Sequence, residues 1–258
     1  PLFLTQPSEA LIKKYRSLEE VQIQRLNAGG QDSKSEWSYS VGLDHERNRY
    51  TNIVPYDKSR IRLSVAPGFD DYINASYVAL DLKEYSLRRG NYIATQGPTE
   101  NTTSHFWQMC YNSVKSNNVV IVMVTPLVEK RINKCHKYWP DSGTLDLPNL
   151  DGFNQSLKIE FLSSEKIDDS FLLTNLKIIP DDPQLPVKQV YHLYYDQWKD
   201  FHKPTSIDPI ILLNKYAESY LADPNDPMIV HCSAGVGRSG TFITLSYLLS
   251  CSKTFVLG

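Results

Sequence analysis

The sequence predicts a single domain of mixed α/β (α+β) class, with a mixed β-sheet and helices on its faces. Strand patterns and helix patterns alternate through most of the 258 residues, which is typical of such an architecture. Residues 119–124 are a nearly continuous β-branched run, as expected of a strand buried on both faces. With 41% hydrophobic and 22% charged residues, the composition suits one globular unit, and we predict one domain over residues 1–258.

Residues 1–40 predict a helical arm packed on this domain. A first short helix over residues 8–16 is followed by a second, for which Ser17 and Glu20 have capping-box spacing. Because glycine disfavours the helix interior, the pair at positions 29–30 is expected to end the second helix, and a polar loop follows.

The remaining elements follow in alternation. Pro209, just after Asp208, has the fixed φ that suits a first helical position. The segments within 157–179 predict a hairpin or meander. The expected strands are 70–78, 91–98, 119–124, 157–161, 172–179, 190–195 and 228–231, and the expected helices are 104–115, 208–221 and 240–252.

Bulk properties exclude several classes of protein. A net charge of −2 gives no general attraction to nucleic acid or to a membrane surface. No apolar run approaches the length of a membrane span, so we expect no membrane segment. The four cysteines, Cys110, Cys135, Cys232 and Cys251, form no Cys-x-x-Cys pair, which argues against a structural zinc site and a disulfide framework. Because free thiols persist in reducing compartments, we expect the protein in the cytoplasm, with the nucleus as a second possible location.

The stretch from Met228 to Gly240 reads as a short apolar strand, a loop of small residues and a helix start. Cys232 opens the loop and Arg238 closes it. Backbone N–H groups of such a loop can turn inward and cradle an anion, helped by the positive end of the following helix. The same helix end and a nearby cation favour the thiolate, which is the nucleophilic form of cysteine.

The residues beside Cys232 predict phosphoryl transfer to sulfur. Arg238 offers a planar fork for two phosphate oxygens, and Ser239 can donate a hydrogen bond to the sulfur. The alternative is a buried cysteine followed by a glycine-rich turn. His231, the two glycines, Arg238 and Ser239 all stand in register with Cys232, which favours the catalytic interpretation.

Residues 231–240, His-Cys-Ser-Ala-Gly-Val-Gly-Arg-Ser-Gly, resemble the signature of the cysteine-dependent protein tyrosine phosphatases. Segments 47–50, 71–77, 92–98 and 128–140 resemble further motifs of that family, in family order. The resemblance implies a highly twisted mixed β-sheet flanked by helices, of the phosphatase type with a cysteine phosphate-binding loop. It also implies a protein-tyrosine phosphatase that needs no metal and no cofactor.

The resemblance assigns roles outside the cysteine loop. Tyr50 would stack on the substrate ring in a deep slot, although it could also be a core tyrosine. Asn52 would hold the substrate backbone, with a turn-forming asparagine as the alternative. Glu129 would pair with Arg238, unless it is an ordinary surface glutamate. Lys134 would contact the general acid in a closed loop.

The general acid is expected at Asp200 and not at Asp141, although Tyr138-Trp139-Pro140-Asp141 contains the family's Trp-Pro-Asp string. In the family the acid loop follows a His-x-Tyr strand, about thirty residues before the cysteine, whereas the Tyr-Trp-Pro segment is structural. Trp198 would then be a hinge residue and Phe201 the second wall of the ring slot.

The acid loop departs from the family pattern at Lys199, where proline is usual. Loss of proline frees a backbone torsion, so we expect slower or shifted loop closure. A similar Trp-Lys-Asp sequence occurs in some fungal members of the family, so the resemblance leans towards these.

The implied mechanism has two steps. Cys232 attacks phosphorus while Asp200 protonates the tyrosyl oxygen, and water then hydrolyses the phosphocysteine with Asp200 as base. Arg238 and the loop amides would bind the phosphate oxygens; the loop residues are Ser233, Ala234, Gly235, Val236 and Gly237. The implied substrates are proteins that carry phosphotyrosine, and family analogy adds activated protein kinases to these. The resemblance also implies a monomer that acts in signal transduction.

Family domains continue beyond the position of Gly258 with two helices and a glutamine-bearing loop, to which this sequence has no match. On that basis we expect a chain truncated at its C-terminus, with impaired turnover of the phosphocysteine. Two alternatives stay open. One is a phosphotyrosine-binding or trapping pseudophosphatase. The other is a dual-specificity or phosphoinositide phosphatase, although Ser233 to Gly237 includes none of the lysines frequent in such loops.

Overall fold

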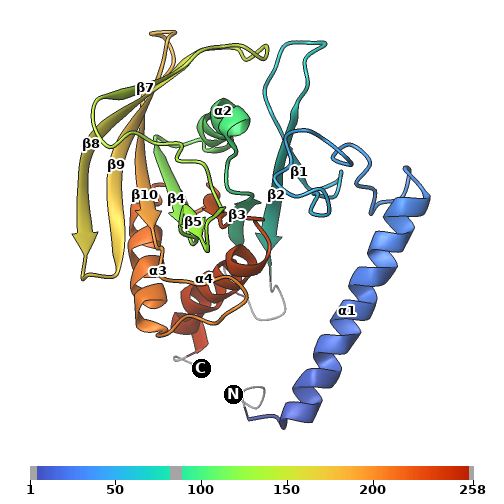
Figure 1. Cartoon of the computed structure of the whole chain (residues 1–258). Helices are drawn as coiled ribbons and strands as arrows, with labels where there is room; N and C mark the ends of the chain where they lie inside the picture. Colours follow the sequence, from blue (N-terminus) through green and yellow to red (C-terminus); the bar gives the residue numbers. More distant parts are fainter. Residues whose placement is uncertain (1–4, 82–88, 256–258) are drawn as a thin grey trace.

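The computed structural model describes residues 5–81 and 89–255, and a nine-stranded sheet lies at its centre (Figure 1). The strand order is β1-β2-β3-β11-β4-β10-β9-β8-β7. Strands β3, β11, β4 and β10 run parallel in the middle, and the outer pairs are antiparallel. The predicted fold class, a twisted mixed sheet flanked by helices, is confirmed.

The sequence position of each element can be followed in Figure 1. The strands of the large sheet are β1 (Arg60–Arg62), β2 (Tyr72–Leu80), β3 (Gly90–Thr95), β4 (Asn118–Met123), β7 (Thr144–Leu147), β8 (Leu157–Ile167), β9 (Phe171–Pro180), β10 (Lys188–Tyr194) and β11 (Met228–His231). A separate hairpin consists of β5 (Val128–Glu129) and β6 (Ile132–Asn133). The helices are α1 (Ser8–Gln31), η2 (Glu100–Thr102), α2 (Thr103–Ser113), α3 (Asp208–Tyr220) and α4 (Gly237–Phe255).

The sheet has a core on each face because successive side chains of a strand point to opposite sides. In β4, Val119 and Ile121 pack in the cluster that contains the α2 side chains. Val120 and Val122 pack in the other cluster, with side chains of α3 and α4. Burial on both faces explains why residues 119–124 read as a continuous apolar run.

The four parallel strands all end at one edge of the sheet. The loops that follow them carry residues 96–99, 124–127, 195–207 and 232–236. In open α/β sheets this carboxyl edge is where ligands bind. The topology therefore brings the Cys232 loop and the expected acid loop to the same edge.

The N-terminal arm differs from the prediction, since α1 is one continuous helix that projects from the body (Figure 1). Ser17 donates to the carbonyl of Lys14 at 2.8 Å, a bond within the helix, instead of capping a second helix. The helix also passes through Gly29, where a Cβ would lie 2.0 Å from the carbonyl oxygen of Trp37. The glycine here permits close packing and does not end the helix; residues 1–4 of the arm lie outside the described residues.

The other boundaries differ by a few residues from those expected. The segments at 157–161 and 172–179 belong to the antiparallel hairpin β8–β9, as one of the two predicted arrangements requires. Helix α4 begins at Gly237, before the expected position 240. Within residues 5–81 and 89–255, no helix combines the length and the apolar character needed to cross a membrane.

Candidate active site

Cys232 begins the loop between β11 and α4 and is only 3% exposed. The N–H of Gly235 donates to its Sγ at 3.2 Å. Gly235 has a φ of +80°, and a Cβ there would lie 2.5 Å from the carbonyl of Thr95 in β3. Only glycine meets both conditions, so the loop curls around the sulfur as expected of an anion cradle.

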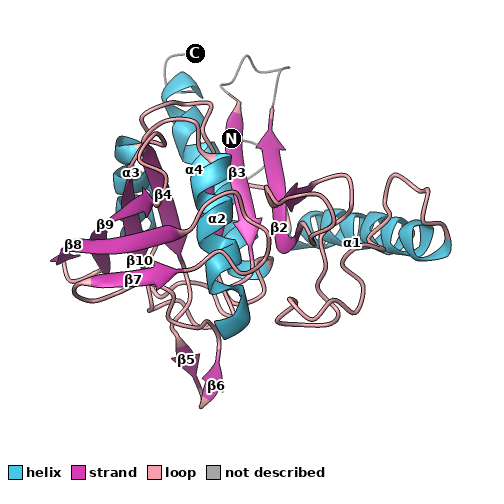
Figure 2. Cartoon of the chain, turned by 90° about the horizontal axis from the view of Figure 1, so that it is seen from above, coloured by secondary structure: helices cyan, strands magenta, loops and turns pink. Residues whose placement is uncertain are grey.

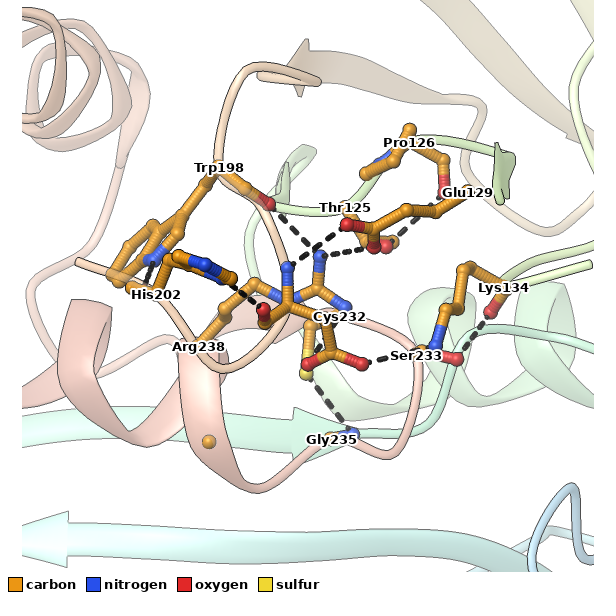
Figure 3. A network of polar contacts seen from close by, with 12 residues as sticks. Thr125, Pro126, Glu129, Lys134, Trp198, His202, Cys232, Ser233, Gly235 and Arg238 are labelled. Carbon is orange, nitrogen blue, oxygen red and sulfur yellow. Dashed lines mark hydrogen bonds and ion pairs between the residues drawn. The ribbon is translucent and has the colours of Figure 1, made fainter. Parts of the chain in front are cut away.

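Arg238, in the first turn of α4, is 5% exposed and reaches back over the loop (Figure 3). Its Nη1 donates to the carbonyl oxygen of Trp198 at 2.9 Å. Its Nη2 lies 3.4 Å from Oδ1 of Asp200, a pair that the sequence did not predict. The predicted pair with Glu129 is present but longer, with 3.9 Å between Nη1 and Oε2.

Asp200 has four polar neighbours, one of which is Nδ1 of His202, 2.6 Å from its backbone carbonyl oxygen. Besides Arg238, the ammonium of Lys134 lies 2.9 Å from its Oδ2, which is the contact predicted from the sequence. Its backbone N–H donates to Oε1 of Glu129 at 3.2 Å. Burial acts to raise the pKa of Asp200, but the hydrogen bond from Lys134 and the charge of Arg238 outweigh burial, and the pKa is lowered.

Cys232, Arg238, Asp200 and Lys134 line a cavity of about 650 Å³, within the range of ligand sites, whereas Glu129 is not part of its lining. Its lining includes most predicted site residues, namely Tyr50, Asn52, Lys134, Trp198, Asp200, Phe201, Cys232, Ser233, Ala234, Val236, Gly237 and Arg238. Phe201 is 98% exposed, so it forms the outer rim and not a buried wall. Asp141 pairs with Lys137 and is not among the lining residues, so Asp200 stays the predicted acid.

The family model described as protein-tyrosine phosphatase matches residues 44–255. The chain belongs to this family. It is 42% identical to "Tyrosine-protein phosphatase 1" of Saccharomyces cerevisiae over 99% of the chain and 81% of that protein. It is 38% identical to "Tyrosine-protein phosphatase 2" of Schizosaccharomyces pombe, over 96% of the chain but only 33% of that protein. The human "Receptor-type tyrosine-protein phosphatase zeta" is 38% identical over 79% of the chain and 9% of its own length. The predicted enzyme class, protein-tyrosine phosphatase, is thereby confirmed.

Tyr50 of this phosphatase domain is tied to the cysteine loop. Its hydroxyl lies 2.8 Å from Oγ of Ser233. Ser233 donates in turn to the carbonyl oxygen of Lys134, also at 2.8 Å, so it accepts the proton of Tyr50. Tyr50 therefore stands at the cavity in a fixed orientation and is not a core tyrosine.

Trp198 anchors the start of the acid loop. Its ring is buried, and Nε1 donates to the carbonyl oxygen of His202 at 2.8 Å. Its own carbonyl accepts from Arg238, so Trp198 is bonded to His202 through its indole and to Arg238 through its backbone. The following segment, from Lys199 to Lys203, is mostly exposed.

A buried network beneath Cys232 was missed by the sequence analysis. The Tyr138 hydroxyl lies 2.7 Å from Nε2 of His231 and 2.8 Å from Nε2 of His192. Nδ1 of His231 lies 3.0 Å from the carbonyl oxygen of Cys232, so it carries the proton and Tyr138 donates to His231. His192 then donates to Tyr138. Burial lowers the pKa of His231 to about 4 and that of His192 to about 3, so both rings are neutral at pH 7.

The hydrogen bond predicted from Ser239 to the sulfur is not formed. Ser239 is fully buried in the first turn of α4, and its Oγ has no hydrogen-bond partner among the described residues. The sulfur accepts instead from the Gly235 N–H. In the same described part of the chain, no group of His, Cys, Asp and Glu side chains is placed to hold a metal ion.

Proposed function

We propose that the chain hydrolyses phosphotyrosine in proteins in two steps, through a phosphocysteine at Cys232. The observation that supports it is the convergence on one cavity of Cys232 and Arg238, which lie at the two ends of one loop, with Asp200 from a second loop. In the first step the S–P bond forms while the bond from phosphorus to the tyrosyl oxygen breaks. Asp200 gives its proton to that oxygen, which removes the cost of expelling a phenolate.

Arg238 and the loop amides bind the phosphoryl oxygens. The ion pair between Arg238 and Asp200 links substrate binding to the protonation of Asp200. A phosphate dianion on Arg238 competes with the Asp200 carboxylate for the same cation, which favours the protonated form of Asp200 as substrate binds. In the second step water attacks phosphorus, the S–P bond breaks, and Asp200 accepts the proton of the water.

The network beneath the loop has a positioning role. His231 donates to the carbonyl of Cys232, and Tyr138 fixes the ring of His231 in one tautomer. Lys134 and Glu129 hold the acid loop over the cavity through the two ends of Asp200. Ser239 retains its proposed role as a donor to sulfur only if its hydroxyl turns during the reaction.

Tyr50 and the depth of the slot support selectivity for phosphotyrosine. A phosphate at the end of a tyrosine reaches Cys232 past the Tyr50 ring, whereas the shorter phosphoserine does not. Asn52 lines the cavity, and its proposed role is to hold the substrate backbone. The absence of lysine between Ser233 and Gly237 disfavours the polyanionic head groups of inositol lipids.

We further propose that the chain acts as one domain and as a monomer in signal transduction, on phosphotyrosine proteins that include activated kinases. The cytoplasm, and also the nucleus, is the proposed location. All four cysteines are unpaired thiols, which persist in reducing compartments.

Phosphate release from a phosphotyrosyl peptide, followed for the chain and for Cys232→Ser, tests the proposal. We expect steady turnover that the variant lacks, with phosphoserine peptides and inositol lipids hydrolysed poorly. Binding of the peptide by folded protein without any release would contradict the proposal and leave the phosphotyrosine-binding alternative. Faster release from the lipids would favour the phosphoinositide class.

A further inference from the structure

We propose that this phosphatase has a docking groove, separate from its catalytic cavity, for a substrate segment in which aliphatic side chains lie between a basic and an acidic one. The inference rests on the proposed function and narrows its substrate class. The docking groove lies between the start of α3 and the turn that joins β8 to β9, and its volume is about 490 Å³. Asp168, Asp208, Ile211, Leu212 and Lys215 are part of its lining.

Helix α3 presents an acid, an aliphatic pair and a base in line along the docking groove. Each step from Asp208 to Ile211 or Leu212, and from these to Lys215, is three or four residues, so the side chains share one face of the helix. Ile211 is 41% exposed, which leaves apolar surface for a ligand to cover. From Asp208 to Lys215 the helix rises by about 10 Å, the length of three residues of extended chain.

The turn that faces α3 adds a second carboxylate in a fixed position. Asp168 and Asp169 have φ values of 44° and 52°, and the Ser170 N–H donates to the carbonyl oxygen of Ile167 at 2.8 Å, as in a type I′ turn. Asp168 is exposed and lines the docking groove, whereas Asp169 pairs with Lys166 at 3.5 Å. Because the turn is already formed, ligand binding need not order it.

The charges in the lining are free to pair with a ligand. Within residues 5–81 and 89–255, none of Asp168, Asp208 and Lys215 takes part in an ion pair. A basic residue of the ligand can therefore pair with the carboxylates and an acidic one with Lys215, while aliphatic residues cover Ile211 and Leu212. A segment of one charge sign would oppose like charges at one end of the α3 face, and this decides the occupant.

The docking groove and the catalytic cavity lie at the same edge of the sheet. Leu172 of β9, just after the turn, pairs with Tyr194 at the end of β10, and α3 follows the acid loop. Figure 1 shows the β8–β9 turn beside α3. Strands β4 and β10 separate β11 from β9, so three strand spacings, about 14 Å, lie between the docking groove and the Cys232 loop. One substrate chain can occupy both sites when about five or more residues join its two segments.

Peptides that carry a phosphotyrosine core and a separate docking segment test the inference. The docking segment is Arg-Ile-Leu-Glu, and a linker of about eight glycine and serine residues joins it to the core. The matched peptide has four serines in place of the docking segment. Each peptide is made with this segment before or after the phosphotyrosine, so that both chain directions are tested. The measured quantity is the ratio of kcat/KM between the docking peptide and the serine peptide.

Three variants separate the docking groove from the rest of the molecule. Asp168→Asn/Asp208→Asn removes both carboxylates at constant side-chain size, and asparagine tolerates the positive φ of position 168. Ile211→Gln removes the aliphatic contact and keeps a good helix former. The control is Glu19→Gln/Glu20→Gln, which removes two exposed carboxylates from α1. Figure 2 shows α1 and α3 on opposite sides of the molecule.

For the wild type we expect kcat/KM to be about tenfold higher for the docking peptide, through a lower KM at unchanged kcat. Asp168→Asn/Asp208→Asn should reduce this ratio about fivefold and Ile211→Gln about threefold, while the control keeps it. A linker of two residues is too short to join the two sites, so it should abolish the advantage.

Equal kcat/KM for the two peptides would overturn the inference, as would a ratio that persists in the groove variants or with the short linker. Hydrolysis of p-nitrophenyl phosphate, which has no docking segment, should be equal in all variants and shows that they fold. Its absence in the wild type would count against the proposed function itself. Its presence together with equal rates for the two peptides would count against the docking groove alone.

Discussion

The Cys232 loop and the acid loop reach the same cavity, but they are held there in different ways. The Cys232 loop follows β11, which lies between β3 and β4 in the centre of the sheet. Its backbone is packed so closely that Gly235 has no room for a side chain. The acid loop is largely exposed, and its Phe201 has a φ of +58°, an uncommon conformation for a bulky residue. A few polar contacts of Trp198 and Asp200 hold it in place.

The two loops differ in how each holds its catalytic group, the nucleophile Cys232 or the acid Asp200. Packing and backbone shape fix the nucleophile, and such constraints leave little freedom to move. Ion pairs with Lys134 and Arg238 fix the acid, whose own side chain is 29% exposed. We therefore predict that the acid loop opens to admit substrate, while the Cys232 loop keeps its shape.

The largest effect is expected for Asp200→Asn, which keeps the size of the side chain and removes the proton that the leaving group needs. We expect kcat for a phosphotyrosyl peptide to fall by about 10²–10⁴. The protonated form is the acid, so wild-type kcat/KM should fall as pH rises through the pKa of Asp200, and the variant should lack this limb. Steady-state kinetics across pH provide the measurement.

Asp141→Asn is the matched control, since Asp141 belongs to the Trp-Pro-Asp string outside the cavity. It should retain the rate and the pH profile of the wild type. Loss of activity in Asp141→Asn but not in Asp200→Asn would show that the acid is assigned to the wrong loop.

Gly235→Ala tests the rigid half of the contrast. The new Cβ would meet the backbone of Thr95 at 2.5 Å, in a conformation that L residues rarely adopt. We expect the free energy of unfolding in urea to fall by about 3 kcal/mol or more. Gly237→Ala, where a Cβ meets nothing within 4 Å, should change stability by less than about 1 kcal/mol. Equal stability of the two variants would refute steric control of the loop.

The buried histidines give a pH dependence of stability. The pKa values of His231 and His192, about 4 and about 3, lie below the ordinary 6.5, so the unfolded chain binds protons that the folded chain does not. The free energy of unfolding should therefore fall as pH is lowered from 6.5 towards 4, by about 1.4 kcal/mol per pH unit for each histidine.

Denaturant unfolding of His192→Gln checks this slope. Glutamine can still donate to the Tyr138 hydroxyl but does not titrate, so the slope should lose the contribution of one histidine. His136→Gln, at an exposed histidine, should keep the wild-type slope. An unchanged slope in His192→Gln would mean that His192 does not resist protonation in the fold.

The smallest effect is expected for Lys134→Gln, which weakens the polar contacts of the acid loop. Removal of the cation raises the pKa of Asp200, so the acid stays protonated to higher pH. The alkaline limb of kcat/KM should therefore shift upward. Lys137→Gln, whose lysine pairs with Asp141, should leave the limb in place. A limb that does not move in Lys134→Gln would show that this ion pair does not form in solution.

The sequence revealed the site where its residues are contiguous. The Cys232 loop is a local motif, and the strand before it is a local apolar pattern, so both were predicted. Contacts between distant segments could not be read in the same way: Tyr138, His192 and His231 come from three parts of the chain, and no pattern joins them. The pair between Asp200 and Arg238 was missed for the same reason.

Local signals also failed where tertiary contacts decide. Ser17 has capping-box spacing with Glu20 but bonds within a continuous helix. Gly29 reads as a helix end, yet it is the contact point between α1 and Trp37. Ser239 stands in the right register for the sulfur, but the orientation of a buried hydroxyl is set by its surroundings.

Detection of the phosphocysteine tests the central claim most directly. The chain is mixed with a phosphotyrosyl peptide, quenched in acid within milliseconds, digested and examined by mass spectrometry. We predict a phosphoryl group on the peptide that contains Cys232, formed before steady release of phosphate and absent from Cys232→Ser. Full release of phosphate with no label on Cys232, or with the label on another residue, would contradict it.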